Sequence, residues 1–75
     1  SKKALLVGIN KYLLPGNDLR GCVNDICAIE TELRNYQYTE IHKLTDTEAT
    51  KKNILSELEW LIADSQELVF HYSGH

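Results

Sequence analysis

A continuous apolar run near the amino end, residues 4–9 (ALLVGI), constrains the fold more than any other stretch of this sequence. A strand with one face open to water alternates apolar and polar residues, whereas an unbroken apolar run indicates a strand covered on both faces. Such strands are typical of parallel sheets that carry helices on each side. We therefore interpret this run as the central strand of an α/β fold.

Changes of period predict two further strands and two helices. From residue 22 apolar side chains recur every three or four positions, which indicates a helix, and a second such stripe follows a capping segment at residues 46–50. Residues 40–44 alternate polar and apolar, as in a half-exposed edge strand, while residues 67–73 form an aromatic-rich strand. The expected stripes are Cys22, Ile26, Ile29, Leu33 and Tyr36 in the first helix, and Ile54, Leu55, Leu58, Leu61 and Ile62 in the second.

The order strand, helix, strand, helix, strand predicts a three-layer α/β/α arrangement around a parallel sheet. Right-handed crossovers, with the polar strand placed outermost, give the flavodoxin-like order 2-1-3. Strands 1 and 3 are then neighbours whose following connections leave on opposite faces, which predicts a crevice at their carboxyl ends. The segment Gly21-Cys22 and the histidine at position 75 should meet there.

Composition narrows the classes of partner. The 8 Lys and Arg are scattered against 11 Asp and Glu, so a net charge of -3 leaves no basic stripe for nucleic acid. No apolar run approaches the roughly 20 residues of a membrane span. We expect a small cytoplasmic module without membrane or nucleic-acid partners, and two cysteines, Cys22 and Cys27, too poorly oriented on one helix to form a disulfide.

The strand end Ser73-Gly74-His75 holds the chemistry that the residues themselves suggest. A histidine at such a place suits general acid–base work, because its pKa lies near neutrality. No phosphate-binding glycine motif is present, and His71 and His75 have no third ligand at metal spacing, so neither a nucleotide nor a metal is expected. Cys22, at a helix start, is either a thiol beside a ligand or a small apolar contact beneath the helix. Cys27 is expected in the core.

Four segments in order, residues 19–25 (LRGCVND), 44–46 (LTD), 58–61 (LEWL) and 70–75 (FHYSGH), resemble the metacaspases, which are caspase-like cysteine peptidases. The resemblance covers nearly the whole chain. It implies that residues 1–75 are the N-terminal portion of a single caspase-like peptidase domain, an incomplete fragment with three strands and two helices.

The resemblance also implies roles for individual residues. His75 matches the catalytic histidine, whose cysteine partner would lie beyond this chain, so the 75 residues alone should be inactive. Cys22, Asp25 and Ser73 match positions that line the substrate pocket. Leu19 stands where caspases proper carry an arginine, which implies cleavage after arginine or lysine in peptide substrates. The implied partners are such a substrate and the remainder of the domain; no cofactor is expected in this chain, and calcium could bind downstream residues.

Two other interpretations remain open from the sequence. The chain could be a catalytically silent caspase-like scaffold or partner-binding module, since fold does not guarantee activity. A flavodoxin-like regulatory module is a third interpretation, although it would favour an acidic or phosphate site at the strand ends. Asp25 likewise has an alternative role as a carboxylate serving the helix end, a role that the neighbouring Asn24 could fill.

Overall fold

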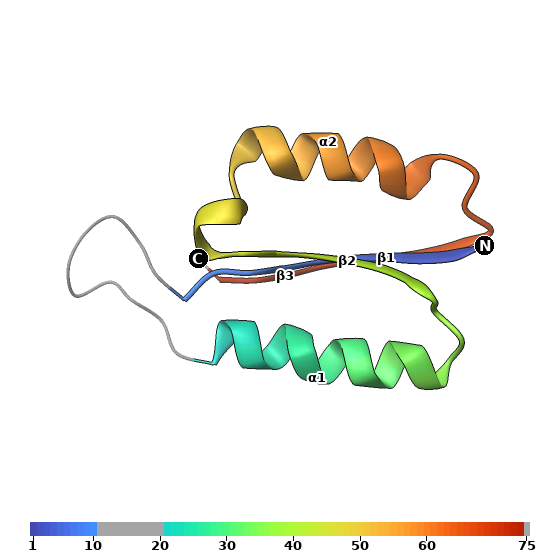
Figure 1. Ribbon diagram of the computed structural model, residues 1–75, viewed down its shortest axis with the longest axis horizontal. Helices are drawn as coiled ribbons and strands as arrows, with labels where there is room; N and C mark the ends of the chain where they lie inside the picture. The colour runs from blue at the N-terminus through green and yellow to red at the C-terminus, as the bar shows by residue number, and fades with distance from the viewer. Residues whose placement is uncertain (11–20, 75) are drawn as a thin grey trace.

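The computed structural model describes residues 1–10 and 21–74 and has the predicted α/β architecture. Figure 1 shows a flat sheet between two helices, α1 on one face and α2 on the other, which confirms the three layers. The elements in chain order are β1 (Lys2–Gly8), α1 (Cys22–Asn35), β2 (Glu40–Thr45), the short 3-10 helix η1 (Asp46–Glu48), α2 (Lys51–Ile62) and β3 (Glu67–Ser73).

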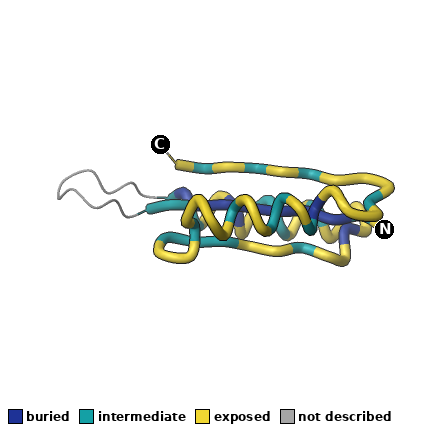
Figure 2. Tube along the Cα trace, turned by 90° about the horizontal axis from the view of Figure 1, so that it is seen from above, coloured by how far each residue is buried: buried dark blue, intermediate teal, exposed yellow. Residues whose placement is uncertain are grey.

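All strand pairs are parallel, and the sheet order is β2-β1-β3. The predicted order 2-1-3 is therefore confirmed. Gly8 at the end of β1 lies opposite Thr45 of β2 and Ser73 of β3, so the three strands finish at the same edge. Figure 2 agrees with the unbroken apolar run of the first strand: β1 is buried from Lys3 to Gly8, whereas β2 and β3 contain only exposed and half-buried residues.

The side chains of β1 divide between two cores, one on each face of the sheet. Leu5 and Val7 are fully buried with Leu61 of α2. Successive strand residues point to opposite faces, so Ala4, Leu6 and Gly8 face α1, where Ile26 is fully buried. Each buried leucine contributes about 1.5–3 kcal/mol through removal of its apolar surface from water.

The capping segment predicted before the second helix is present in two parts. Residues 46–48 form η1, and Thr50 then caps α2, accepting a hydrogen bond from the backbone N–H of Asn53 at 3.1 Å. Asp46 adopts a left-handed backbone with φ 48° as the chain leaves β2. Aspartate tolerates this conformation better than most residues, so a tight change of direction follows the strand.

Four residues predicted to be buried are wrongly placed by the apolar pattern. Cys27 is exposed, because a helix turns about 100° per residue and Ile26 already faces the sheet. Tyr36 is 66% exposed, since α1 ends one residue before it. Leu55 and Ile62 of α2 are 52% and 69% exposed, on the flank of the helix away from the contact between Trp60 and β2.

The edge strand β2 is polar, as predicted, but its charged side chains have partners. Lys43 pairs with Glu30 of α1 at 2.7 Å, and Arg34 pairs with the same carboxylate at 2.8 Å. The hydrogen bonds that Glu30 accepts from Lys43 and then from Arg34 lower the pKa of Glu30, and the bond that Lys43 donates to Glu30 raises the pKa of Lys43. These pairs are near the surface, so they add little stability and discourage pairing of another strand with β2.

His42 is also exposed on β2, and it stacks on Trp60 of α2. The ring centroids are 3.5 Å apart with an interplanar angle of 9°, and Nδ1 lies 2.7 Å from Oε2 of Glu57. The strand pattern predicts an exposed position on an edge strand for this residue. The structure adds that the imidazole ring is in contact with Trp60 and Glu57 of α2.

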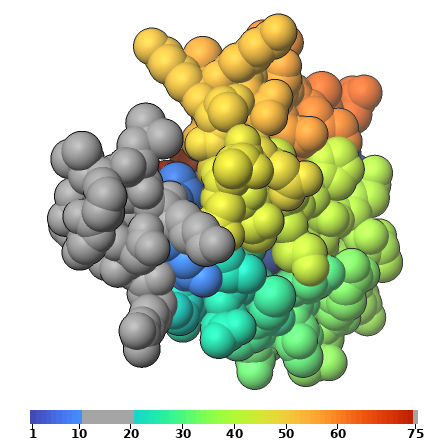
Figure 3. All heavy atoms as spheres, turned by 60° about the vertical axis from the view of Figure 1, so that its left-hand side comes forward, coloured from blue at the N-terminus to red at the C-terminus, as the bar shows by residue number. Residues whose placement is uncertain are grey.

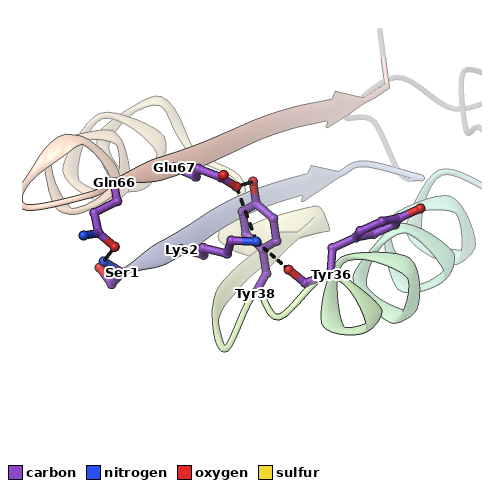
Figure 4. Close-up of polar contacts among 6 residues, drawn as sticks. All are labelled: Ser1, Lys2, Tyr36, Tyr38, Gln66 and Glu67. Carbon is purple, nitrogen blue, oxygen red and sulfur yellow. Dashed lines mark hydrogen bonds and ion pairs between the residues drawn. The ribbon is translucent and has the colours of Figure 1, made fainter.

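Polar contacts close the amino end of the sheet, opposite the edge where the strands finish (Figure 4). Lys2 donates to the backbone carbonyl of Tyr36 at 2.8 Å and lies 3.6 Å from the carboxylate of Glu67. Tyr38 donates to that carboxylate at 3.1 Å, and burial, followed by this hydrogen bond, raises the pKa of the Tyr38 hydroxyl. These contacts connect β1, β3 and the segment that follows α1.

Candidate functional site

Ser73 stands at the carboxyl edge of the sheet, where the pairing of β1 with β3 extends past the strand. The backbone N–H of Ile9 donates to the carbonyl of Ser73 at 3.0 Å. Because Ser73 lies opposite Gly8, its side chain points to the face that α1 covers. His75, the predicted catalytic residue, lies two positions further along the chain and outside the described residues.

The first turn of α1 rests directly on the end of β1. A Cβ atom added to Gly8 would lie 3.0 Å from the carbonyl oxygen of Cys22 and 3.1 Å from Cδ1 of Ile26, so a larger residue would require the turn to shift by a few tenths of an ångström. Cys22 is 8% exposed beneath the turn. In Figure 3 this turn, the end of β1 and the connection from β2 to α2 gather on one face of the molecule.

Two of the predicted pocket residues meet at this edge. The hydroxyl of Ser73 donates to Oδ2 of Asp25 at 3.5 Å, the long limit of a hydrogen bond, across 48 positions of sequence. Asp25 is exposed and its backbone N–H donates to the carbonyl of Gly21 at 2.7 Å, as helix pairing requires. The helix therefore holds the backbone of Asp25 while its carboxylate faces the end of β3. Cys22, the third candidate, lies buried in the same turn.

Asn10 also lies at this edge, and the sequence did not predict its role there. The N-cap residue of α1 is Gly21, with φ 88° and no side chain to cap the helix. The Oδ1 of Asn10 instead accepts from the backbone N–H of Val23 at 3.2 Å. Asn10 thus serves the helix end for which Asn24 was considered. An asparagine directly after an apolar strand was the available signal, but nothing local in the sequence identifies its partner.

Cys22 and Cys27 are both free thiols. Within residues 1–10 and 21–74, no three His, Cys, Asp or Glu side chains gather as ligands for a metal ion. No helix in the same described ranges has the length and apolar character needed to cross a bilayer. Leu19, on which the expectation of basic specificity partly rests, is not among the described residues.

The close approach at Gly8 gives a first testable expectation. Gly8→Ala should destabilise the domain by about 1–3 kcal/mol, because the new methyl group would press on a backbone carbonyl that no side-chain rotation can remove. Chemical denaturation of the full-length protein would measure this change. Glu59→Ala, on the exposed side of α2, is the control and should change the stability by less than about 0.5 kcal/mol. Equal unfolding midpoints for the two variants would contradict the expected contact.

The parallel 2-1-3 sheet with side chains gathered at its carboxyl edge defines a three-layer α/β protein whose candidate site lies at the strand ends. Comparison with known families specifies the class further: the family described as metacaspase, peptidase C14 domain, matches residues 2–75. The chain therefore belongs to the metacaspase family of caspase-like cysteine peptidases.

Similar proteins include three fungal proteins named metacaspase-1. The protein of Meyerozyma guilliermondii is 46% identical over 86 aligned positions, covering 99% of this chain and 21% of that protein. The protein of Scheffersomyces stipitis is 44% identical with the same coverage, and that of Schizosaccharomyces pombe is 40% identical with 99% and 20% covered. The chain thus spans about a fifth of the length of these relatives.

Proposed function

We propose that this chain is the N-terminal portion, residues 1–75, of the peptidase domain of a cysteine endopeptidase that cleaves after arginine or lysine. Membership of the metacaspase family supports peptidase chemistry. The contact between Asp25 and Ser73 carries the proposal of basic specificity, because it places an exposed carboxylate at the end of β3. Ser73 is two positions before His75 in the sequence.

In the proposed reaction a cysteine beyond this chain is the nucleophile. His75 removes the proton from its thiol, the thiolate attacks the scissile carbonyl carbon, and the histidine gives the proton to the leaving amine. Water then hydrolyses the thioester that remains, returning the free thiol. The 75 residues alone are expected to cleave no peptide, since this nucleophile is absent from them.

Asp25 is proposed to bind the basic side chain that precedes the scissile bond. A carboxylate and a guanidinium can form two parallel charge-assisted hydrogen bonds, whereas lysine offers a single compact charge. The alternative role of Asp25 at the helix end is not needed for the N–H of Val23, which Asn10 already accepts. Ser73 supports the carboxylate from the opposite strand.

The remainder of its own domain is the second proposed partner, and an exposed apolar row on β3 supports it. Leu68, Phe70 and Tyr72 are 46%, 44% and 41% exposed, and their pairing with residues 3, 5 and 7 places them on the face of α2. Right-handed crossover from β3 to a further parallel strand beside it would carry the connecting segment over that same face. We propose that this segment covers the row and the exposed flank of α2.

Peptide cleavage by the full-length protein tests the proposal. Matched peptides ending in Arg, Lys, Asp or Ala before a reporter group, together with a thiol probe directed at the active site, should show labelling and a preference for Arg or Lys. A preference for Asp would contradict the assignment of specificity. Neither labelling nor cleavage of any peptide would favour the catalytically silent scaffold instead.

A further inference from the structure

Asn10 links three elements at the carboxyl edge of the sheet. It follows β1 after a single residue and is half-buried there. Its backbone N–H donates to Oδ1 of Asp46 at 2.8 Å, at the end of β2, and its side-chain oxygen accepts from Val23 in the first turn of α1 at 3.2 Å. One residue therefore connects the ends of two neighbouring strands to the start of a helix.

The first turn of α1 depends on contacts from outside the helix for its placement. The first N–H groups of any helix have no partner within it, and Gly21 at the N-cap cannot supply one from its side chain. Asn10, just after β1, supplies an acceptor to this turn. Gly8, two residues before Asn10, packs tightly against the same turn. The turn is thus held at the end of β1 by a hydrogen bond to Asn10 and by close packing over Gly8.

Asp46 makes the position of Asn10 itself definite. Its left-handed backbone, with φ 48°, turns the chain at the end of β2, and its carboxylate receives the Asn10 N–H. The backbone of Asn10 is therefore held at the end of β2, while its side chain reaches the first turn of α1. An acceptor whose backbone is anchored in this way links the first turn of α1 to the ends of both strands.

We propose that Asn10 is a positioning residue for substrate specificity. It holds the first turn of α1 so that the carboxylate of Asp25, two residues after Val23, faces Ser73 at the end of β3. This inference rests on the proposed role of Asp25 in binding arginine. Asn10 touches neither the basic side chain nor the reacting atoms; it acts through the placement of the turn.

Loss of the acceptor should affect arginine binding more than bond cleavage. Misplacement of a binding group by about 1 Å can reduce a rate by about 100-fold, and a two-point pair with a guanidinium is sensitive to such a shift. The expected effect is about a tenfold loss of discrimination between Arg and Ala peptides, through a higher KM with kcat nearly unchanged. Labelling by the thiol probe should stay at the level of the parent.

Three variants of Asn10 and one control variant, all in the full-length protein, separate positioning from simple stabilisation. Asn10→Leu keeps the size of the side chain and removes the acceptor. Asn10→Ala also removes the acceptor but has a smaller side chain, and it replaces the leucine variant should that variant not fold. Asn10→Asp retains the acceptor and should restore the selectivity to within about threefold of the parent, since a carboxylate is also favoured at a helix start. Thr50→Ala removes the corresponding acceptor at the start of α2 and serves as the control of similar stability cost.

We expect Asn10→Leu and Thr50→Ala to lower the melting temperature alike, with selectivity lost only in the former. Equal selectivity in these two variants, or failure of Asn10→Asp to restore it, would overturn the proposal. Hydrogen exchange of the Val23 amide provides a readout independent of activity: it should accelerate in Asn10→Leu and recover in Asn10→Asp. If the parent protein shows no preference for arginine, the proposed specificity fails, and an unchanged Val23 exchange rate would separately overturn the positioning role.

Discussion

Full-length protein carrying His75→Ala is expected to cleave arginine peptides more slowly than the parent by roughly 10³-fold or more. The physical reason is the loss of the group that takes the thiol proton and delivers it to the leaving amine. Initial rates on a single arginine peptide would measure the effect, and labelling by an active-site thiol probe should fall in parallel because less thiolate is available.

A matched histidine variant makes this result specific to position 75. His71→Gln changes a histidine of β3 that is partly buried on the face toward α1. It should retain activity within a few-fold of the parent, with any loss arising through stability. Equal losses in the two variants would indicate damage to β3 rather than removal of a proton carrier, and full activity in His75→Ala would reject the proposed mechanism.

The second large effect is expected at Asp25. Asp25→Ala should lower kcat/KM for arginine peptides by about 10- to 100-fold, because a hydrogen-bonded pair with a charged group contributes about 1.5–3 kcal/mol. The exposure of the carboxylate favours the lower part of that range. Asp25→Asn should lose less, since an amide oxygen can still accept one hydrogen bond from the guanidinium. Thiol labelling should remain at the level of the parent in both variants.

Glu32→Ala provides the charge control for this experiment. Glu32 is an exposed carboxylate on the same helix, so its removal changes the net charge equally without touching the strand ends. Its kcat/KM for arginine peptides should stay close to that of the parent. An unchanged preference for arginine in the Asp25 variants, or an equal loss in Glu32→Ala, would reject the role assigned to Asp25.

Most of the fold could be predicted because its signals are local. The apolar run of β1, the polar alternation of β2 and the threonine that caps α2 each express the environment of a single element, and the right-handed crossover rule then orders the strands. Burial of individual helix residues was less predictable. Cys27, Tyr36, Leu55 and Ile62 carry apolar side chains in plausible positions, but their exposure depends on where each helix ends and how it is rotated against the sheet.

The candidate site also has residues that could be predicted from the sequence and one residue that could not. Resemblance to the family selected His75, Cys22, Asp25 and Ser73, and their roles stay predictions; the structure adds that Asp25 and Ser73 are in contact and that Cys22 is buried. The role of Asn10 could not be predicted, because its two hydrogen-bond partners, Val23 and Asp46, lie 13 and 36 positions away in the sequence. A hydrogen bond of that kind leaves no periodic trace in the sequence.

The sequence by itself determined the elements, the parallel sheet and its strand order, since periodicity and chirality act on each segment before any tertiary contact forms. Tertiary structure alone decided which side chains meet at the carboxyl edge. Gly8 admits the first turn of α1, Asn10 and Asp46 orient it, and the Asp25 carboxylate then faces Ser73 across 48 residues. Such contacts depend on the packing of whole elements at ångström precision, which no local pattern of residues encodes.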